Sequence, residues 1–129
     1  MPKAKPLISI VDDDESMREA VKGLMRSVGY RVEAVASPQG FLCSRHVRRT
    51  SCVIADMQMP GMTGLELYQR LSTSGKPIPT ILITAYPDND VRERALAAGV
   101  IGYLSKPFEE GDLLACIRLA LTHARSGGR

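Results

Sequence analysis

Short apolar runs rich in Val, Ile and Leu recur along the chain, separated by more polar stretches. Within most of these runs nearly every position is apolar, rather than alternating with polar residues. That pattern is typical of a parallel sheet whose two faces are both covered by helices. We therefore predict five buried strands, at residues 7–11, 31–35, 51–55, 80–84 and 100–104.

Between the runs, apolar residues recur at spacings of three and four, which indicates amphipathic helices. Gly29 suits the C-terminal cap of the first helix. Thr63 with Glu66 fits the reciprocal spacing of a capping box, and Asp88 can cap a later helix. The predicted helices carry their apolar residues within 17–28, 38–47, 65–71, 91–98 and 113–121, of which 38–47 is the least regular.

Strand and helix thus alternate five times, which argues for a doubly wound (βα)5 α/β sandwich with right-handed crossovers. At 129 residues the chain is long enough for one domain with a substantial core and short for two. We expect that domain over residues 7–124. A disordered N-terminus at residues 1–6 would precede it, and a flexible tail or the start of a linker at 125–129 would follow.

Charge and hydropathy argue against several classes of function. The net charge of +3, from 17 basic and 14 acidic residues, is too small to argue for nucleic-acid binding. No helix-turn-helix candidate or zinc-ligand spacing is present, so we expect no direct contact with nucleic acid. The first apolar run is short and leads into acidic residues, which fits neither a signal peptide nor a membrane span. We expect a cytoplasmic protein that does not associate with a membrane.

Chemically reactive side chains follow the ends of the predicted strands. The first run leads into Asp12 and Asp13, the third into Asp56, the fourth ends in Thr84, and Lys106 follows the fifth. In open α/β sheets, ligands bind outside the carboxyl ends of the strands, near the point where the strand order reverses. These groups are therefore expected along one edge of the sheet.

Carboxylates that converge on such an edge repel one another unless a cation neutralises them. Oxygen ligands without a nearby His or Cys suit a hard divalent ion such as Mg²⁺. A carboxylate, a metal and the ammonium group of Lys106 are what phosphoryl transfer needs, because its catalysis rests on positioning and charge stabilisation. Asp56 stands alone at the end of a buried strand and is the best candidate for a nucleophile that forms an aspartyl phosphate.

Four motifs at these strand ends identify a resemblance. The stretches VDDDE, IADMQMPGMTGLEL, ILITAY and GYLSKPF occur in this order and together resemble the receiver family of two-component response regulators. The resemblance covers residues 7–121. It implies a CheY-like, flavodoxin-like fold with a five-stranded parallel sheet in the order 2-1-3-4-5. It also implies a phosphoprotein that acts in signal transduction.

The resemblance implies a role for each matching residue of the acidic edge. Asp56 would accept a phosphoryl group from a sensor histidine kinase or a small phosphodonor, and Lys106 would pair with its charge. The implied ligands of Mg²⁺, for which Mn²⁺ can substitute, are Asp13, Asp56, the backbone carbonyl of Gln58 and, through water, Asp12. The side chain of Gln58 is then free to vary.

Other matching positions imply how the signal is passed on. Thr84 matches a switch hydroxyl that turns toward the phosphoryl group, and Tyr103 matches an aromatic residue that follows it inward. The peptide bond Lys106–Pro107 is cis in relatives. Met57 and Tyr86 occupy positions that tune the lifetime of the phosphoryl group, and their apolar and bulky side chains suggest restricted access of water.

The implied output surface lies on the helix after residue 88, the last strand and the final helix. An output domain or a downstream protein would read it, and charged residues on it suit a phosphorylation-dependent homodimer: Arg92, Arg94, Glu109, Glu110 and Asp112. The stretches ITAYPDND and GYLSKPFE resemble regulators of the FixJ/NarL type, which carry a helix-turn-helix domain. The sequence leaves open a stand-alone receiver or the amino-terminal part of a longer regulator.

Two other functions remain open from the residues. A Mg²⁺-dependent phosphatase or phosphotransferase can use an aspartyl nucleophile on a similar fold. The resemblance to such enzymes implies a second acid two residues after the nucleophile, but this chain has Gln58 at that position, which counts against turnover. A pseudo-receiver would bind a partner without phosphorylation, and the intact set of acids, Thr84 and Lys106 gives no reason to prefer it. A receiver catalyses only its own phosphorylation and dephosphorylation, so we do not expect an enzyme with turnover.

Overall fold

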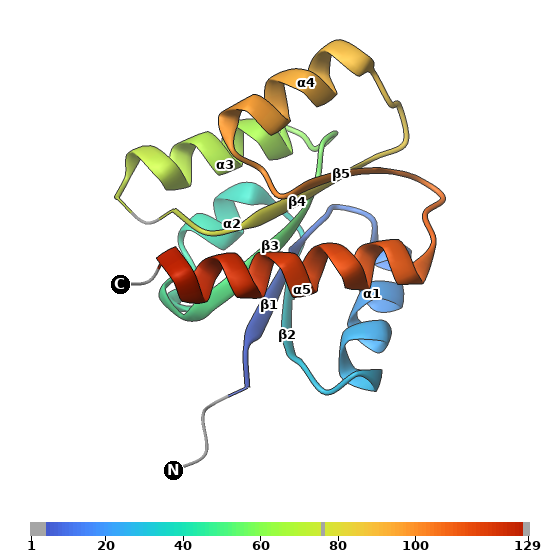
Figure 1. Cartoon of the computed structure of the whole chain (residues 1–129), viewed down its shortest axis with the longest axis vertical. Coiled ribbons are helices and arrows are strands. Elements are labelled where there is room, and N and C mark those ends of the chain that lie inside the picture. The colour runs from blue at the N-terminus through green and yellow to red at the C-terminus, as the bar shows by residue number, and fades with distance from the viewer. Residues whose placement is uncertain (1–4, 76, 128–129) are drawn as a thin grey trace.

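Strands and helices alternate along the chain in the computed structural model, which describes residues 5–75 and 77–127, with side chains described as far as residue 122 (Figure 1). The strands are β1 (Leu7–Val11), β2 (Arg31–Val35), β3 (Thr50–Asp56), β4 (Thr80–Thr84) and β5 (Gly102–Ser105). The helices are α1 (Glu15–Ser27), α2 (Pro38–Leu42), α3 (Gly64–Thr73), α4 (Asn89–Ala98) and α5 (Glu110–Gly127), with the 3₁₀ turn η1 (Arg45–Arg49) before β3.

Most predicted elements are present, and the differences have local causes. The last strand begins at Gly102 rather than at residue 100, because the N–H of Val100 closes the end of α4 by donating to Ala95. The prediction of one helix at 38–47 is wrong: α2 ends at Leu42, and the Ser44 hydroxyl caps the separate turn η1. Helix α5 continues to Gly127. Residues 1–4 and 128–129, which fall in the expected terminal segments, lie outside the described residues.

The five strands form one parallel sheet in the order β2-β1-β3-β4-β5, which confirms the predicted flavodoxin-like topology. The chain runs outward from β1 to β2 and then returns to place β3 on the other side of β1, so the strand order reverses between β1 and β3. In the register of the sheet, Val11 lies beside Ala55 and Thr84 lies beside Ser105. The residues that follow β1, β3 and β5 therefore emerge along one edge.

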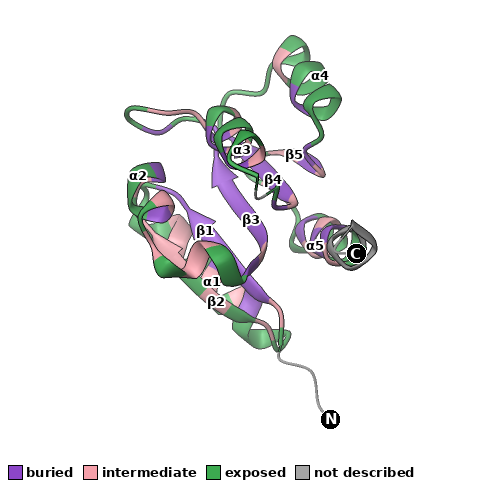
Figure 2. Cartoon of the chain, turned by 90° about the vertical axis from the view of Figure 1, so that its left-hand side faces the viewer, coloured by how far each residue is buried: buried purple, intermediate pink, exposed green. Residues whose placement is uncertain are grey.

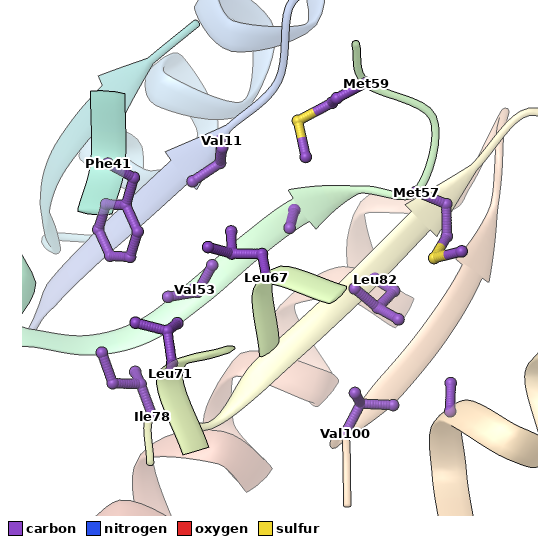
Figure 3. Close-up of a cluster of buried hydrophobic side chains, with 12 residues drawn as sticks. Val11, Phe41, Val53, Met57, Met59, Leu67, Leu71, Ile78, Leu82 and Val100 are labelled. Carbon is purple, nitrogen blue, oxygen red and sulfur yellow. The ribbon is translucent and has the colours of Figure 1, made fainter. Parts of the chain in front are cut away.

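Two apolar layers hold the sheet between its helices, because successive strand residues point to opposite faces. In β3, Cys52 and Ile54 pack in the layer beneath α1 and α5. Val53 and Ala55 pack in the layer beneath α2, α3 and α4, which Figure 3 shows in part. The central strands β1, β3 and β4 are thus buried on both faces, as the continuous apolar runs predict (Figure 2).

Helix α4 is attached to the sheet by a narrow apolar contact. Of its ten residues, Ala95 alone is buried, and Val91 is partly buried against the same layer. Most of the helix is exposed in Figure 2. Asp88 caps its start by accepting hydrogen bonds from two backbone N–H groups, and Gly99 ends it in the left-handed conformation with φ 116°. Within the described residues, no helix combines the length and apolar character needed to cross a membrane.

Gly64 allows α3 to begin close to the end of β3. A Cβ atom at this position would lie 2.7 Å from the carbonyl oxygen of Asp56 and 2.9 Å from Cδ2 of Leu82. Both distances are shorter than real carbon contacts, and the first involves backbone. Thr63 fixes the same helix start with the predicted capping box, in which its hydroxyl and the side chain of Glu66 each accept a backbone N–H.

Replacing Gly64 with alanine is expected to lower the free energy of unfolding by about 1–3 kcal/mol, because a well-packed region must shift to admit the methyl group. The matched control is Gly23→Ala, within α1, where no atom lies within 4 Å of the added Cβ. That control is expected to stabilise the protein by up to about 1 kcal/mol. Urea denaturation measures both, and a Gly64→Ala protein as stable as wild type would contradict the close approach.

Candidate functional site

Sheet hydrogen bonding continues beyond the ends of the strands and fixes the backbone of the site. The N–H of Asp12 donates to the carbonyl oxygen at the end of β2, at 3.2 Å. The N–H groups of Met57 and Lys106 donate to two carbonyl oxygens at the end of β4, each at 2.8 Å. These three residues follow β1, β3 and β5 directly. The first residue of each connecting loop is therefore as firmly placed as the strand before it.

Three carboxylates and one ammonium group meet at this edge. Asp12, Asp13 and Asp56 each offer a carboxylate oxygen, and these oxygens lie within 4.8 Å of one another. Asp12 and Asp56 are only 3% and 6% exposed, whereas Asp13 is exposed. Nζ of Lys106 lies 3.6 Å from Oδ2 of Asp12 and 3.7 Å from Oδ2 of Asp56. One lysine cannot neutralise three acids, so negative charge is in excess.

Further hydrogen bonds orient the two buried acids. Oδ1 of Asp12 accepts the N–H of Asp14 at 2.9 Å, and Nη1 of Arg18 donates to the carbonyl oxygen of Asp12, also at 2.9 Å. Oδ1 of Asp56 accepts the N–H of Gln58 at 3.3 Å. Asp14 caps the start of α1, because its side chain accepts the N–H of Ser16. The acids are thus held by backbone as well as by Lys106.

The pKa of Asp56 is raised above its ordinary value of 3.8, mainly because burial disfavours the charged form. The negative charge of Asp12 raises this pKa further, and Asp13 adds to the effect. The N–H of Gln58 and the charge of Lys106 act in the opposite direction. Burial and the neighbouring acids thus disfavour the charged form of Asp56 in the absence of a further cation.

The donor set fits a hard divalent cation. It contains carboxylate oxygens alone, with the three acids close enough to share one ion. Ions such as Mg²⁺ prefer oxygen ligands, and a double positive charge would relieve the repulsion between the acids. Of the predicted ligands, Asp13 lies in the loop after β1, whereas Asp56 ends β3 and Gln58 lies in the loop that follows it.

Thr84 lies at the end of β4, and its hydroxyl both donates and accepts a hydrogen bond. It is completely buried, its Oγ1 donates to Oε1 of Gln58 at 2.9 Å, and it accepts the N–H of Tyr86 at 2.9 Å. The contact from Gln58 was not expected, since the sequence assigns a role only to the backbone carbonyl of that residue. No sequence signal reports it, because the contact depends on the conformation of a long side chain.

The remaining candidate residues lie around this centre. Tyr103 on β5 is partly buried and packs against the layer that contains Met57, which is 8% exposed and lies near Leu82 in Figure 3. Tyr86 is 73% exposed, so most of its ring faces solvent. The Lys106–Pro107 peptide bond is cis. The charged residues of the expected output surface are all exposed: Arg92, Arg94, Glu109, Glu110 and Asp112.

Comparison with known proteins assigns the family. Residues 8–118 match the response regulator receiver domain, so the chain belongs to that family and is a phosphorylatable receiver domain, not a classical enzyme. It is 40% identical over 121 residues to response regulator protein TmoT of Ectopseudomonas mendocina, covering 94% of this chain and 55% of that protein. It is 32% identical over 122 residues to transcriptional regulatory protein FixJ of Bradyrhizobium diazoefficiens, covering 95% and 60%.

Solved structures agree with the fold and the family. The structure of response regulator StyR has a TM-score of 0.87 at 41% identity, covering 95% of this chain and 62% of that one. The structure of FixJ-N has a TM-score of 0.83 at 28% identity, covering 94% and 97%. The chain spans about half the length of the curated relatives it matches, with 55% of TmoT as an example.

In the metal-free protein, Asp56→Asn is expected to stabilise the fold at pH 7. An acid whose pKa is raised by folding binds its proton more tightly in the native state, so its contribution to stability falls as pH rises from 3.8 through the raised pKa. The variant lacks this charge and should melt a few degrees higher, where about 1 kcal/mol corresponds to about 2–8 °C. The gain should shrink as the pH is lowered toward 4.

Thermal melts with a chelator, and then with Mg²⁺, measure this effect. Asp90→Asn removes an exposed carboxylate of α4 and serves as the control, with an expected change within about 0.5 kcal/mol. Mg²⁺ should raise the melting temperature of wild type more than that of Asp56→Asn. A variant that melts below wild type at pH 7 without metal would contradict the electrostatic account of the site.

Proposed function

We propose that Asp56 accepts a phosphoryl group from a sensor histidine kinase or a small phosphodonor, in a reaction that depends on Mg²⁺. The observation that carries this proposal is the convergence of two buried carboxylates and Lys106 at the edge where the strand order reverses. Asp56 is the member of the cluster that ends the central strand β3. The family supports the reaction class, and the position of Asp56 at the end of β3 supports its choice as the acceptor.

In the proposed reaction, a carboxylate oxygen of Asp56 attacks the phosphorus atom of the donor. The bond from phosphorus to the donor's leaving atom breaks, and its electron pair departs with the donor. Lys106 reaches both buried acids and meets the negative charge of the transferred oxygens. Asp13, Asp56 and the carbonyl of Gln58 would hold Mg²⁺ or Mn²⁺, with Asp12 acting through water. The ion supplies positive charge to the phosphoryl oxygens.

The proposed switch begins at Thr84 and ends on the face formed by α4, β5 and α5. The Thr84 hydroxyl turns toward the phosphoryl group, Tyr103 turns inward, and the α4-β5-α5 face changes its packing. Support for this route comes from the partly buried Tyr103, which packs against the same layer as α4. Met57 and Tyr86 would tune the phosphoryl lifetime by limiting the access of water. Met57 would do so as a buried side chain and Tyr86 as an exposed one.

An output domain or a downstream protein would read the switched face. The exposed basic residues of α4 and the exposed acids near the start of α5 suit a phosphorylation-dependent homodimer through α4-β5-α5. Relatives named as response regulators and transcriptional regulators support a cytoplasmic receiver, over residues 7–124, that is controlled by a sensor histidine kinase.

Incubation with acetyl phosphate or phosphoramidate and Mg²⁺ should add one phosphate per chain, because the label stays on a single carboxylate. Mass spectrometry of the intact protein detects it, and the label should be stable in acid and labile in base. Asp56→Asn should lose the label, whereas Asp90→Asn should keep it. Undiminished labelling of Asp56→Asn would show that the acceptor lies elsewhere, and continuous release of phosphate from a monoester would indicate a phosphatase.

Beryllofluoride with Mg²⁺ should shift amide NMR signals across α4, β5 and α5 as well as beside Asp56. The reason is that a phosphoryl mimic recruits the Thr84 hydroxyl and thereby moves the face behind it. Thr84→Val should keep the signals near Asp56 perturbed but reduce those on the distal face. If the wild-type face remained unchanged when the site is saturated, the proposed coupling would be wrong.

A further inference from the structure

The hydroxyl of Thr84 can donate only one hydrogen bond. A threonine hydroxyl carries one proton and two acceptor lone pairs. Here one lone pair accepts the N–H of Tyr86, and the proton is donated to Oε1 of Gln58, each over 2.9 Å. A phosphoryl oxygen is an acceptor and needs that same proton. The bond to Gln58 and a bond to a phosphorylated Asp56 therefore exclude each other.

We propose that Gln58 is a positioning residue for the switch, whose side-chain amide holds the Thr84 hydroxyl in its unphosphorylated orientation. This inference rests on the function proposed above, in which Thr84 moves toward Asp56. Gln58 then acts through Thr84 and opposes activation. On phosphorylation, a charged phosphoryl oxygen has to replace Oε1 of Gln58 as the acceptor of the Thr84 hydroxyl. Charge-assisted hydrogen bonds are about twice as strong as neutral ones.

Burial explains why the contact matters to Thr84. Thr84 is 0% exposed, so its hydroxyl has no free exchange with solvent and needs a partner within the protein. Gln58 supplies that partner from an exposed position next to the acceptor. The backbone N–H of the same residue donates to Oδ1 of Asp56 at 3.3 Å. One residue thus contacts both the phosphoacceptor and the switch, through different groups.

The size of the effect follows from the kind of bond. A neutral hydrogen bond to an exposed amide competes with water and contributes modestly, so its loss should shift the switch by about three- to tenfold. Gln58→Met keeps the length of the side chain and removes the acceptor. The backbone carbonyl and the backbone N–H of residue 58 remain. The variant should therefore bind a phosphoryl mimic more tightly rather than less.

Beryllofluoride tests the proposal without interference from phosphoryl hydrolysis. With saturating Mg²⁺, Gln58→Met is expected to bind beryllofluoride about three- to tenfold more tightly than wild type. In a Thr84→Val background the same substitution should have no effect, because no hydroxyl remains to be held. The matched control is Gln69→Met on the exposed face of α3, which should leave the affinity unchanged.

Each outcome of the double-mutant cycle is informative. An unchanged or weaker affinity in Gln58→Met would overturn the proposal, as would an equal gain in both Thr84 backgrounds. A wild-type protein that binds no beryllofluoride would instead contradict the proposed function, so the two failures are distinguishable. A second readout uses the free protein without metal. NMR couplings should report one Thr84 rotamer in wild type and several in Gln58→Met, and identical rotamers would overturn the proposal.

Discussion

The structure depends on the placement of two buried carboxylates beside each other at the junction of two central strands. Asp12 and Asp56 follow from the register of β1 and β3, and neither can move away without breaking the sheet hydrogen bonds that continue past them. Lys106, which reaches both acids, is shared and leaves negative charge unbalanced. The fold therefore maintains a repulsion between carboxylates that a divalent cation would relieve.

The apolar layers make this repulsion tolerable. Close carboxylates at one edge lower the stability of the fold, so the rest of the sheet must offset that cost. The burial of β1, β3 and β4 on both faces provides this stabilisation. Because Gly64 has no side chain, the backbone at the start of α3 can lie directly against the carbonyl oxygen of Asp56. Stability of the core and chemistry at the edge are parts of one arrangement.

Sequence patterns predicted the strands and the acidic edge because both depend on local information. Continuous apolar runs define buried strands, and the residue after each strand end is fixed by topology, so Asp12, Asp56 and Lys106 could be placed together in advance. The split between α2 and η1 was missed because Ser44 ends one element and caps the next. The contact of Gln58 with Thr84 was also missed, since it joins residues far apart through a side chain whose rotamer no pattern specifies.

Helix α4 contributes a different kind of property. A helix that buries one alanine and part of a valine has nearly all of its surface free from the demands of the core. Substitutions on that surface can accumulate with little cost to folding, whereas changes in β3 or at the acidic edge cannot. If a partner reads this surface, as proposed above, relatives with the same fold can differ in what they recognise, because the surface residues of α4 are not the residues that stabilise the core.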